Sequence, residues 1–208
     1  YYKLDALSDP LTTETEPLEI YRSGKQYNFY QTGEKIEHDD FPYSKKVFEP
    51  SPLNRVTKEG APGESWQPDS QDDYNSTDHT IKLSYDFNQE NEVLIWTYQY
   101  PTDNHPMGLI SSGDASPVYY EPFQLHKNRT KDEQGHQVIT YVDKEGRTLL
   151  KRVQAAEGAA AINDTNYAST YFVHDDLGNL VYVIPPEATR LITKASSEYF
   201  GKSDGEKE

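Results

Sequence analysis

The sequence predicts a mainly β protein: an antiparallel sheet of successive hairpins, with little helix and one short C-terminal helix. Three observations predict this fold class. The motif Asp-x-x-Gly followed by a polar residue occurs three times, each time between segments of strand character. Apolar and polar side chains alternate over residues 81–87, as in a strand with one buried and one wet face. The chain also contains 17 tyrosines, which fit a half-buried pleated surface.

The three motifs predict tight turns between paired strands. An aspartate at the first turn position accepts a hydrogen bond from the backbone two residues on. A glycine three residues later adopts the left-handed conformation that a three-residue hairpin loop with a bulge requires. A recurring hairpin device indicates an architecture built by repetition. The residues to which we assign this structural role are Asp132, Gly135, Asp143, Gly146, Asp175 and Gly178.

The first part of the chain has weaker patterns. Residues 1–26 are polar, and short strands are expected around Leu18 and Ile20 and over residues 27–30. Residues 41–68 contain five prolines, which predicts an extended segment with turns and no strand pairing. A polar loop is expected over residues 69–78. We therefore expect residues 1–80 to form an irregular, proline-rich segment with short strands.

The second part predicts most of the sheet. The strand at 81–87 is expected to pair with the apolar stretch 93–100, and a loop-rich passage follows. A β-hairpin repeat region over 81–186 and a short helix with a charged tail over 187–208 complete the expected organisation. The remaining strands are expected at 118–126, 138–142, 147–153, 169–174 and 179–184.

Composition excludes several classes of function. The formal net charge is −15, so nucleic acids and anionic membrane surfaces would be repelled. The chain has no cysteine, which excludes disulfides, thiolate nucleophiles and cysteine zinc sites. No apolar run is long enough to cross a bilayer, so no membrane insertion is expected. The chain starts at Tyr1, and we expect a mature product or a piece of a longer protein.

Candidate chemistry is sparse. The acidic pairs 39–40, 72–73 and 175–176 do not predict the opposed carboxylates of a glycosidase, and solvated surface explains them better. The six histidines lack metal-ligand spacing, and Asp175, Asp176 and Asn179 supply too few oxygens for a calcium loop. We therefore expect no catalytic residue, no metal and no cofactor.

Exposed aromatic residues form the candidate binding surface. Trp66, Tyr119 and Tyr120 could offer a platform for a carbohydrate or a cell-surface protein. The alternative is structural: Trp66 would pin its loop to the sheet, while Trp96, which could join such a platform, would belong to the core. We favour the structural alternative for both tryptophans.

Two of the turn segments resemble a known repeat. Residues 141–147 and 172–180 resemble the YD repeats of bacterial Rhs proteins, whose core is Tyr-Asp-x-x-Gly-Arg/Asn-Leu/Val. Val142 and His174 stand where that pattern has tyrosine. The wider resemblance runs from Asp5 to Ala188. Further stretches similar to one subfamily of secreted Rhs-repeat proteins are 43–56, 60–63, 149–152 and 182–188.

The resemblance implies a secreted or cell-surface bacterial protein, often very long, whose repeats coil as a β-sheet shell around a C-terminal toxin. It implies that this chain is a non-catalytic structural section of such a shell. Its partners would be the remainder of its own polypeptide and an encapsulated toxin domain. The unpaired edges of an isolated section also favour an edge-strand dimer. The alternatives are a surface module that binds carbohydrate or protein and, with little support, an acid/base hydrolase.

Overall fold

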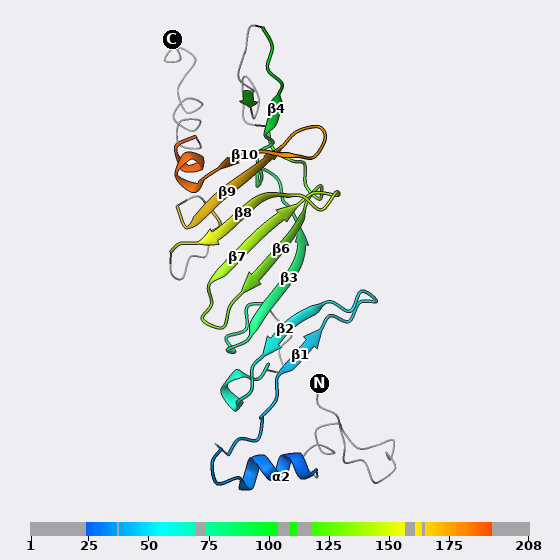
Figure 1. Cartoon of the computed structure of the whole chain (residues 1–208), viewed down its shortest axis with the longest axis vertical. Coiled ribbons are helices and arrows are strands. Elements are labelled where there is room, and N and C mark those ends of the chain that lie inside the picture. The colour runs from blue at the N-terminus through cyan, green and yellow to red at the C-terminus, as the bar shows by residue number, and fades with distance from the viewer. Residues whose placement is uncertain are drawn as a thin grey trace. The chain divides into compact units, whose positions relative to one another are not determined.

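The computed structural model describes residues 24–36, 38–69, 74–103, 109–111, 118–156, 161–163 and 165–192 (Figure 1). The chain divides into two compact units, Tyr1–Thr80 and Ile81–Glu208. The strands expected around Leu18 and Ile20 lie outside the described residues.

The first described element of the first unit is a helix, α2, over Lys25–Thr32. The prediction of a strand at 27–30 is therefore wrong. The segment contains no glycine or proline, and local bonds satisfy its backbone: Asn28 N donates to Gly24 O at 3.2 Å, and Gly33 N donates to Phe29 O at 3.0 Å. Aromatic residues favour strands through contacts with neighbouring strands, and such contacts depend on tertiary structure.

A hairpin of two strands follows, β1 over Lys45–Phe48 and β2 over Val56–Gly60. The expectation that residues 41–68 lack strand pairing is wrong here, because the prolines lie in the connecting loop and outside the two strands. In the loop, the Arg55 guanidinium donates to both Glu49 carboxylate oxygens at 2.8 and 2.9 Å. That bond and the Ser51 hydroxyl lower the pKa of Glu49 to about 2. A short 3-10 turn, η1, covers Glu64–Trp66.

A buried lysine ties the end of the first unit to β2. The side chain of Lys58 is 2% exposed, and its Nζ lies 2.7 Å from Asp69 Oδ1 and 3.2 Å from Asp78 Oδ2. Asp78 Oδ1 also accepts from the hydroxyls of Ser76 and Thr80, each at 3.0 Å. Burial lowers the pKa of Lys58, but the two carboxylates raise it more, so the ammonium stays charged.

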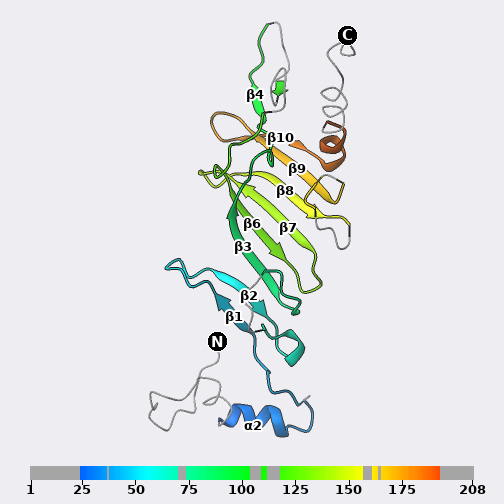
Figure 2. The ribbon, with the colours of Figure 1, turned by 180° about the vertical axis from the view of Figure 1, so that it is seen from behind.

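The second unit is built on six antiparallel strands in the order β3-β6-β7-β8-β9-β10. They succeed one another across a twisted sheet that can be followed from both sides (Figure 1, Figure 2). A helical segment at 186–192 follows the last strand. This architecture confirms the mainly β, antiparallel prediction with a short C-terminal helix. The strands are β3 Ile81–Phe87, β6 His126–Lys131, β7 Gln137–Val142, β8 Thr148–Gln154, β9 Tyr167–His174 and β10 Leu180–Ile184.

Residues 93–100 do not pair with 81–87, which corrects the sequence prediction. Instead β3 pairs with β6, and the strand expected at 118–126 lies at His126–Lys131. The buried Asn88 directs the chain out of the ladder: its Nδ2 donates to Glu121 O at 2.9 Å and its Oδ1 accepts from Leu125 N at 2.8 Å. Two further short strands, β4 Thr97–Gln99 and β5 Leu109–Ser111, pair with each other.

The six-stranded sheet has one covered face and one open face. On the covered face lie the buried Ile139, Tyr141, Leu150 and Tyr171, and Val93 and Leu94 belong to the same core cluster. This explains why residues 93–94 are apolar without belonging to the ladder: they pack on the sheet. The open face carries no fully buried residue at the paired positions Tyr85, Asn128, Thr140, Lys151 and Thr170.

Candidate functional site

The three Asp-x-x-Gly stretches form the same turn, joining β6 to β7, β7 to β8 and β9 to β10. In each, the backbone N–H of the aspartate donates to the carbonyl four residues on, at 2.9–3.0 Å. The glycine N–H donates back to the aspartate carbonyl at 2.9–3.1 Å. The glycine φ angles are positive, at 93° for Gly135, 83° for Gly146 and 84° for Gly178. This is a tight turn followed by a left-handed residue.

The aspartate side chains stabilise the turns from inside. In all three copies, Oδ1 accepts from the backbone N–H two residues on at 3.0 Å and four residues on at 2.8 Å. The pKa of Asp175 is lowered, first by the Asn179 side chain and then by backbone donors. For Asp132 and Asp143, burial raises the pKa, but the hydrogen bonds outweigh it and lower the value. The motif therefore contains two side-chain bonds, of which sequence reasoning found one.

The side chain of the polar residue after each glycine contacts the aspartate carboxylate of the same turn. Arg147 Nε donates to Asp143 Oδ2 at 2.6 Å, and Asn179 Nδ2 donates to Asp175 Oδ2 at 3.0 Å. In the first turn, His136 Nδ1 lies 3.4 Å from an aspartate oxygen. The second carboxylate oxygen thus also has a partner, which explains why a polar residue stands at this position.

We expect Gly146→Val to lower the free energy of unfolding by about 1–3 kcal/mol, because a β-branched residue is strained at positive φ. No described heavy atom beyond its neighbours lies within 4 Å of the position of an added Cβ. A loss of stability would therefore reflect backbone strain and not a steric clash. The measurement is urea unfolding of the full chain. Gly146→Asn is the matched control, because asparagine tolerates this conformation and should cost less. A valine variant as stable as the parent would contradict the turn assignment.

A buried ionic cluster fastens the chain after β3 to the covered face. The Glu92 carboxylate accepts from the Lys127 ammonium and, at 2.6 Å, from the Tyr141 hydroxyl. Arg152 Nη2 donates to the Glu92 carbonyl at 3.1 Å, and its guanidinium lies 5.7 Å from the Tyr141 ring centroid. Burial raises the pKa of Glu92, but the bonds from Lys127 and Tyr141 lower it more. In this cluster Glu92 Oε1 is shared between two donors, and Arg152 Nε is buried without a hydrogen-bond partner in the described part of the chain.

A pocket opens where β8 and β9 separate. Their pairing ends at Leu150 and Tyr171, and the register of β7 against β8 shifts at this point, so that Leu149 bulges from the ladder. Leu149 and Phe172, the next residues toward the turns, both line the pocket. The gap lies between two successive turns, because Arg147 Nη1 is 3.5 Å from the position of an added Cβ at Gly178. The pocket thus lies beside two copies of the turn.

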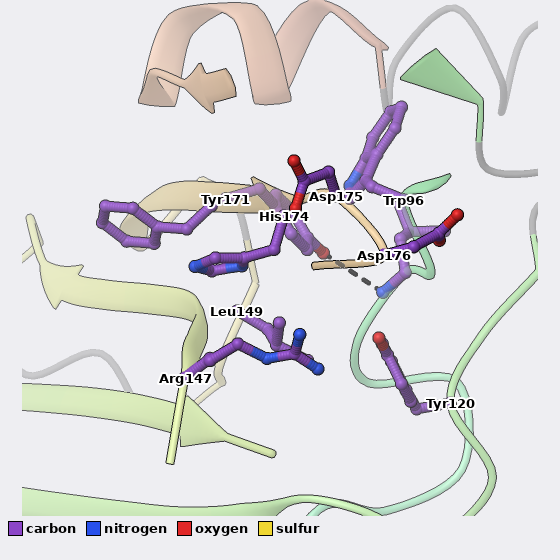
Figure 3. Close-up of a pocket in the computed structure, with 10 residues that line it drawn as sticks. Trp96, Tyr120, Arg147, Leu149, Tyr171, His174, Asp175 and Asp176 are labelled. Carbon is purple, nitrogen blue, oxygen red and sulfur yellow. Dashed lines mark hydrogen bonds between the residues drawn. The ribbon is translucent and has the colours of Figure 1, made fainter. Parts of the chain in front are cut away.

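The pocket is lined by both aromatic and polar side chains (Figure 3). Its volume is about 280 Å³. Arg147, in the turn before β8, faces His174 of β9 (Figure 3), while Trp96 and Tyr120 belong to the segment between β3 and β6. Tyr171 is buried, with its ring 5.9 Å from Trp96 and its hydroxyl accepting from Leu94 N at 3.3 Å. The lining residues are Leu94, Trp96, Tyr120, Arg147, Leu149, Tyr171, Phe172, His174, Asp175 and Asp176.

Two nitrogen atoms of pocket-lining side chains have no partner within the described part of the chain. Trp96 Nε1 and His174 Nδ1 are both buried and make no hydrogen bond there. An unpaired buried donor or acceptor costs about 1–3 kcal/mol. Burial raises the pKa of the Tyr120 hydroxyl, and the charge of Asp143 adds to this, so the phenol stays protonated as a donor.

The predicted binding surface is divided between the two units. Trp66 belongs to the first unit, is 41% exposed and lies 5.6 Å from the His79 ring. Tyr119 and Tyr120 belong to the second unit, where Tyr119 bridges to Leu94 and Tyr120 lines the pocket. The structure instead groups Tyr120 with Trp96, which sequence reasoning assigned to the core. Trp96 packs against the core cluster and lines the pocket at once.

The acidic pairs have structural roles where they are described. Asp40 accepts from the Tyr27 hydroxyl at 2.8 Å, and Asp39 from the backbone of Phe41 at 2.7 Å. Both carboxylate oxygens of Asp175 are bonded within its turn. Residues 72–73 lie outside the described residues. The described ranges contain no group of three or more potential metal-ligating side chains and no helix long and apolar enough to span a membrane.

Comparison with known proteins finds a family model that matches part of the chain. Residues 9–81 are similar to the family described as a domain of unknown function, DUF6443. This range covers most of the first unit and ends at the first residue of β3. Neither curated proteins nor solved structures gave a match.

Proposed function

We propose that the chain is a non-catalytic structural section of an exported bacterial Rhs/YD-repeat protein and forms part of a β-sheet wall. The observation that carries this proposal is the repetition of one turn, with the same hydrogen bonds, at three hairpins of the sheet. Turns of this kind join β6 to β7, β7 to β8 and β9 to β10. Repetition of one unit is the means by which extended sheets and solenoids are built.

The two faces of the sheet support the same proposal. One face is covered by the chain's own segment around Glu92 and Val93, and buried ionic bonds fasten it there. The other face lacks such a cover at the paired positions from Tyr85 to Thr170. A sheet one layer thick, closed on one side by its own chain, suits a wall. In the related proteins implied by the resemblance, such a wall encloses a toxin domain.

The proposal predicts that β10 is an internal strand of a longer sheet in the parent protein. In the 208-residue chain, β10 pairs with β9 on one side, and its outer edge has no strand in the sheet order of the described residues. We expect the amides of residues 180–184 to exchange at least about ten times more slowly in the product of the complete reading frame, because a further strand pairs with them.

The measurement is hydrogen exchange by mass spectrometry on both proteins, at low micromolar concentration to suppress edge-to-edge association. Amides of β7, paired on both sides, are the internal reference and should exchange equally in the two proteins. Equal exchange of residues 180–184 in both would show that the sheet ends here and would overturn the wall.

A further inference from the structure

We propose that the pocket between β8 and β9 binds one ring of a neutral carbohydrate. This goes beyond the wall, because it assigns a ligand site to the gap between two successive turns. The pocket volume of about 280 Å³ lies near the lower end of the range for small-ligand sites, on the order of 300–1,000 Å³. One sugar ring, with its neighbours outside, matches this size.

The aromatic side chains that line the pocket suit the C–H face of a sugar. Trp96, Tyr120 and Tyr171 line the pocket, and the Trp96 and Tyr171 rings meet edge to face at 69°. Aromatic faces carry negative partial charge, while the C–H groups of a sugar ring are apolar and weakly positive. The rings are also held rigidly, because Tyr171 bonds to Leu94 N through its hydroxyl.

The unpaired nitrogen atoms specify the polar chemistry of the ligand. The indole N–H of Trp96 can only donate, so it requires an acceptor. His174 Nδ1 can donate or accept, depending on its tautomer. Arg147 contributes Nη1, since its Nε bonds to Asp143 and its Nη2 lies 3.3 Å from Glu145. A hydroxyl group, which both donates and accepts, can satisfy each of these atoms.

Charge argues against both anionic and cationic ligands. Four carboxylates, those of Asp143, Glu145, Asp175 and Asp176, lie on the turns that border the pocket, against two cations on the same turns, Lys144 and Arg147. This excess of negative charge repels an acidic sugar. An ammonium group would suit the carboxylates but brings no acceptor for the Trp96 indole. A neutral polyhydroxyl ligand meets both conditions.

The chain offers a direct spectroscopic test, because it contains two tryptophans. In ¹⁵N-labelled full chain, each indole N–H gives one signal, and Trp66→Phe assigns the remaining signal to Trp96. The probes are cellobiose, maltose, lactose and diacetylchitobiose, with galacturonic acid as the anion and lysine amide as the cation. We expect a saturable shift of the Trp96 signal with at least one neutral disaccharide.

A matched variant connects the shift to the pocket. His174→Phe keeps a ring of similar shape but removes the nitrogen atoms, and it should weaken binding of the same disaccharide about ten-fold, while Trp66→Phe should leave it unchanged. Unchanged backbone amide signals from residues away from the pocket would show that the variant is folded. The proposal is overturned if no neutral probe shifts the signal at about 10 mM, if galacturonic acid or lysine amide binds more tightly, or if His174→Phe binds equally.

The two proposals can fail separately. Slow exchange of β10 in the complete protein without a Trp96 shift would retain the wall and remove the sugar site. A Trp96 shift with unchanged exchange of β10 would retain the sugar site and remove the wall.

Discussion

Glu92→Ala is expected to lower the free energy of unfolding by about 3–5 kcal/mol, as for loss of one partner of a buried ion pair. The variant leaves the buried Lys127 ammonium without its carboxylate and removes the acceptor of the Tyr141 hydroxyl. The loss should therefore exceed the value of the removed contacts. The measurement is urea unfolding followed by Trp96 fluorescence in a Trp66→Phe background, because Trp96 packs against the core of the same unit.

Glu90→Ala is the matched control for this experiment. Glu90 lies two residues earlier in the same connection and is exposed, so its replacement should change stability by less than about 0.5 kcal/mol. Equal losses in the two variants would contradict a structural role for the ionic cluster.

The same cluster has a defined pH dependence. The pKa of Glu92 is lowered in the folded protein, although burial opposes this, because Lys127 and Tyr141 bond to the charged carboxylate. A depressed folded pKa stabilises the protein above the unfolded value of about 4.3, and this contribution is lost as pH falls through the folded pKa. The difference between the parent and Glu92→Ala should therefore shrink below about pH 4.

Lys58→Met is expected to destabilise the first unit by about 3–5 kcal/mol. Methionine fills a similar volume but leaves the carboxylate of Asp78, whose side chain is 7% exposed, without its nearest cation. The hydroxyls of Ser76 and Thr80 and the Asp69 N–H still donate to Asp78, so part of its desolvation stays compensated. The measurement is Trp66 fluorescence during urea unfolding in a Trp96→Phe background.

Lys46→Met on the neighbouring strand is the control for Lys58. Lys46 Nζ lies 3.2 Å from Glu59 Oε1, but these side chains are 50% and 40% exposed. A surface pair of this kind contributes about 0–1 kcal/mol. If Lys58→Met cost no more than Lys46→Met, burial would not be what makes the lysine important.

Local patterns predicted the hairpins well. Aspartate and glycine three residues apart act through bonds within a five-residue loop, so Asp143 and Gly146 can be recognised without knowledge of the rest of the fold. The alternation over 81–87 likewise predicted the bounds of β3, but its faces were assigned wrongly: Lys82 is the buried residue of that strand, while Phe87 is 43% exposed. The missed second bond, donated by the Arg147 backbone N–H to Asp143 Oδ1, has no side-chain signal of its own, whereas a polar residue after every glycine signals the contact to Oδ2.

Local patterns could not predict which distant segments pair or pack together. The stretch around Val93 is apolar in any arrangement, and its sequence does not distinguish a strand beside β3 from a segment lying on the sheet. Asn88 decides between them, through bonds to Glu121 and Leu125 more than 30 residues away. The helix at Lys25–Thr32 was missed for a similar reason, since the strand preference of its aromatic residues depends on neighbours.

For the candidate site too, the sequence predicted the local turns but not the contacts between distant segments. The turns that border the pocket were evident from Asp143, Gly146, Asp175 and Gly178, because backbone conformation there is determined by residues in immediate sequence. The pocket itself was not, because Trp96, Arg147 and His174 meet only where β8 and β9 separate. The sequence by itself determined a mainly antiparallel β protein with repeated tight turns. Tertiary structure decided which strands are neighbours and which side chains share a cavity, because burial and strand pairing arise between segments far apart in the chain.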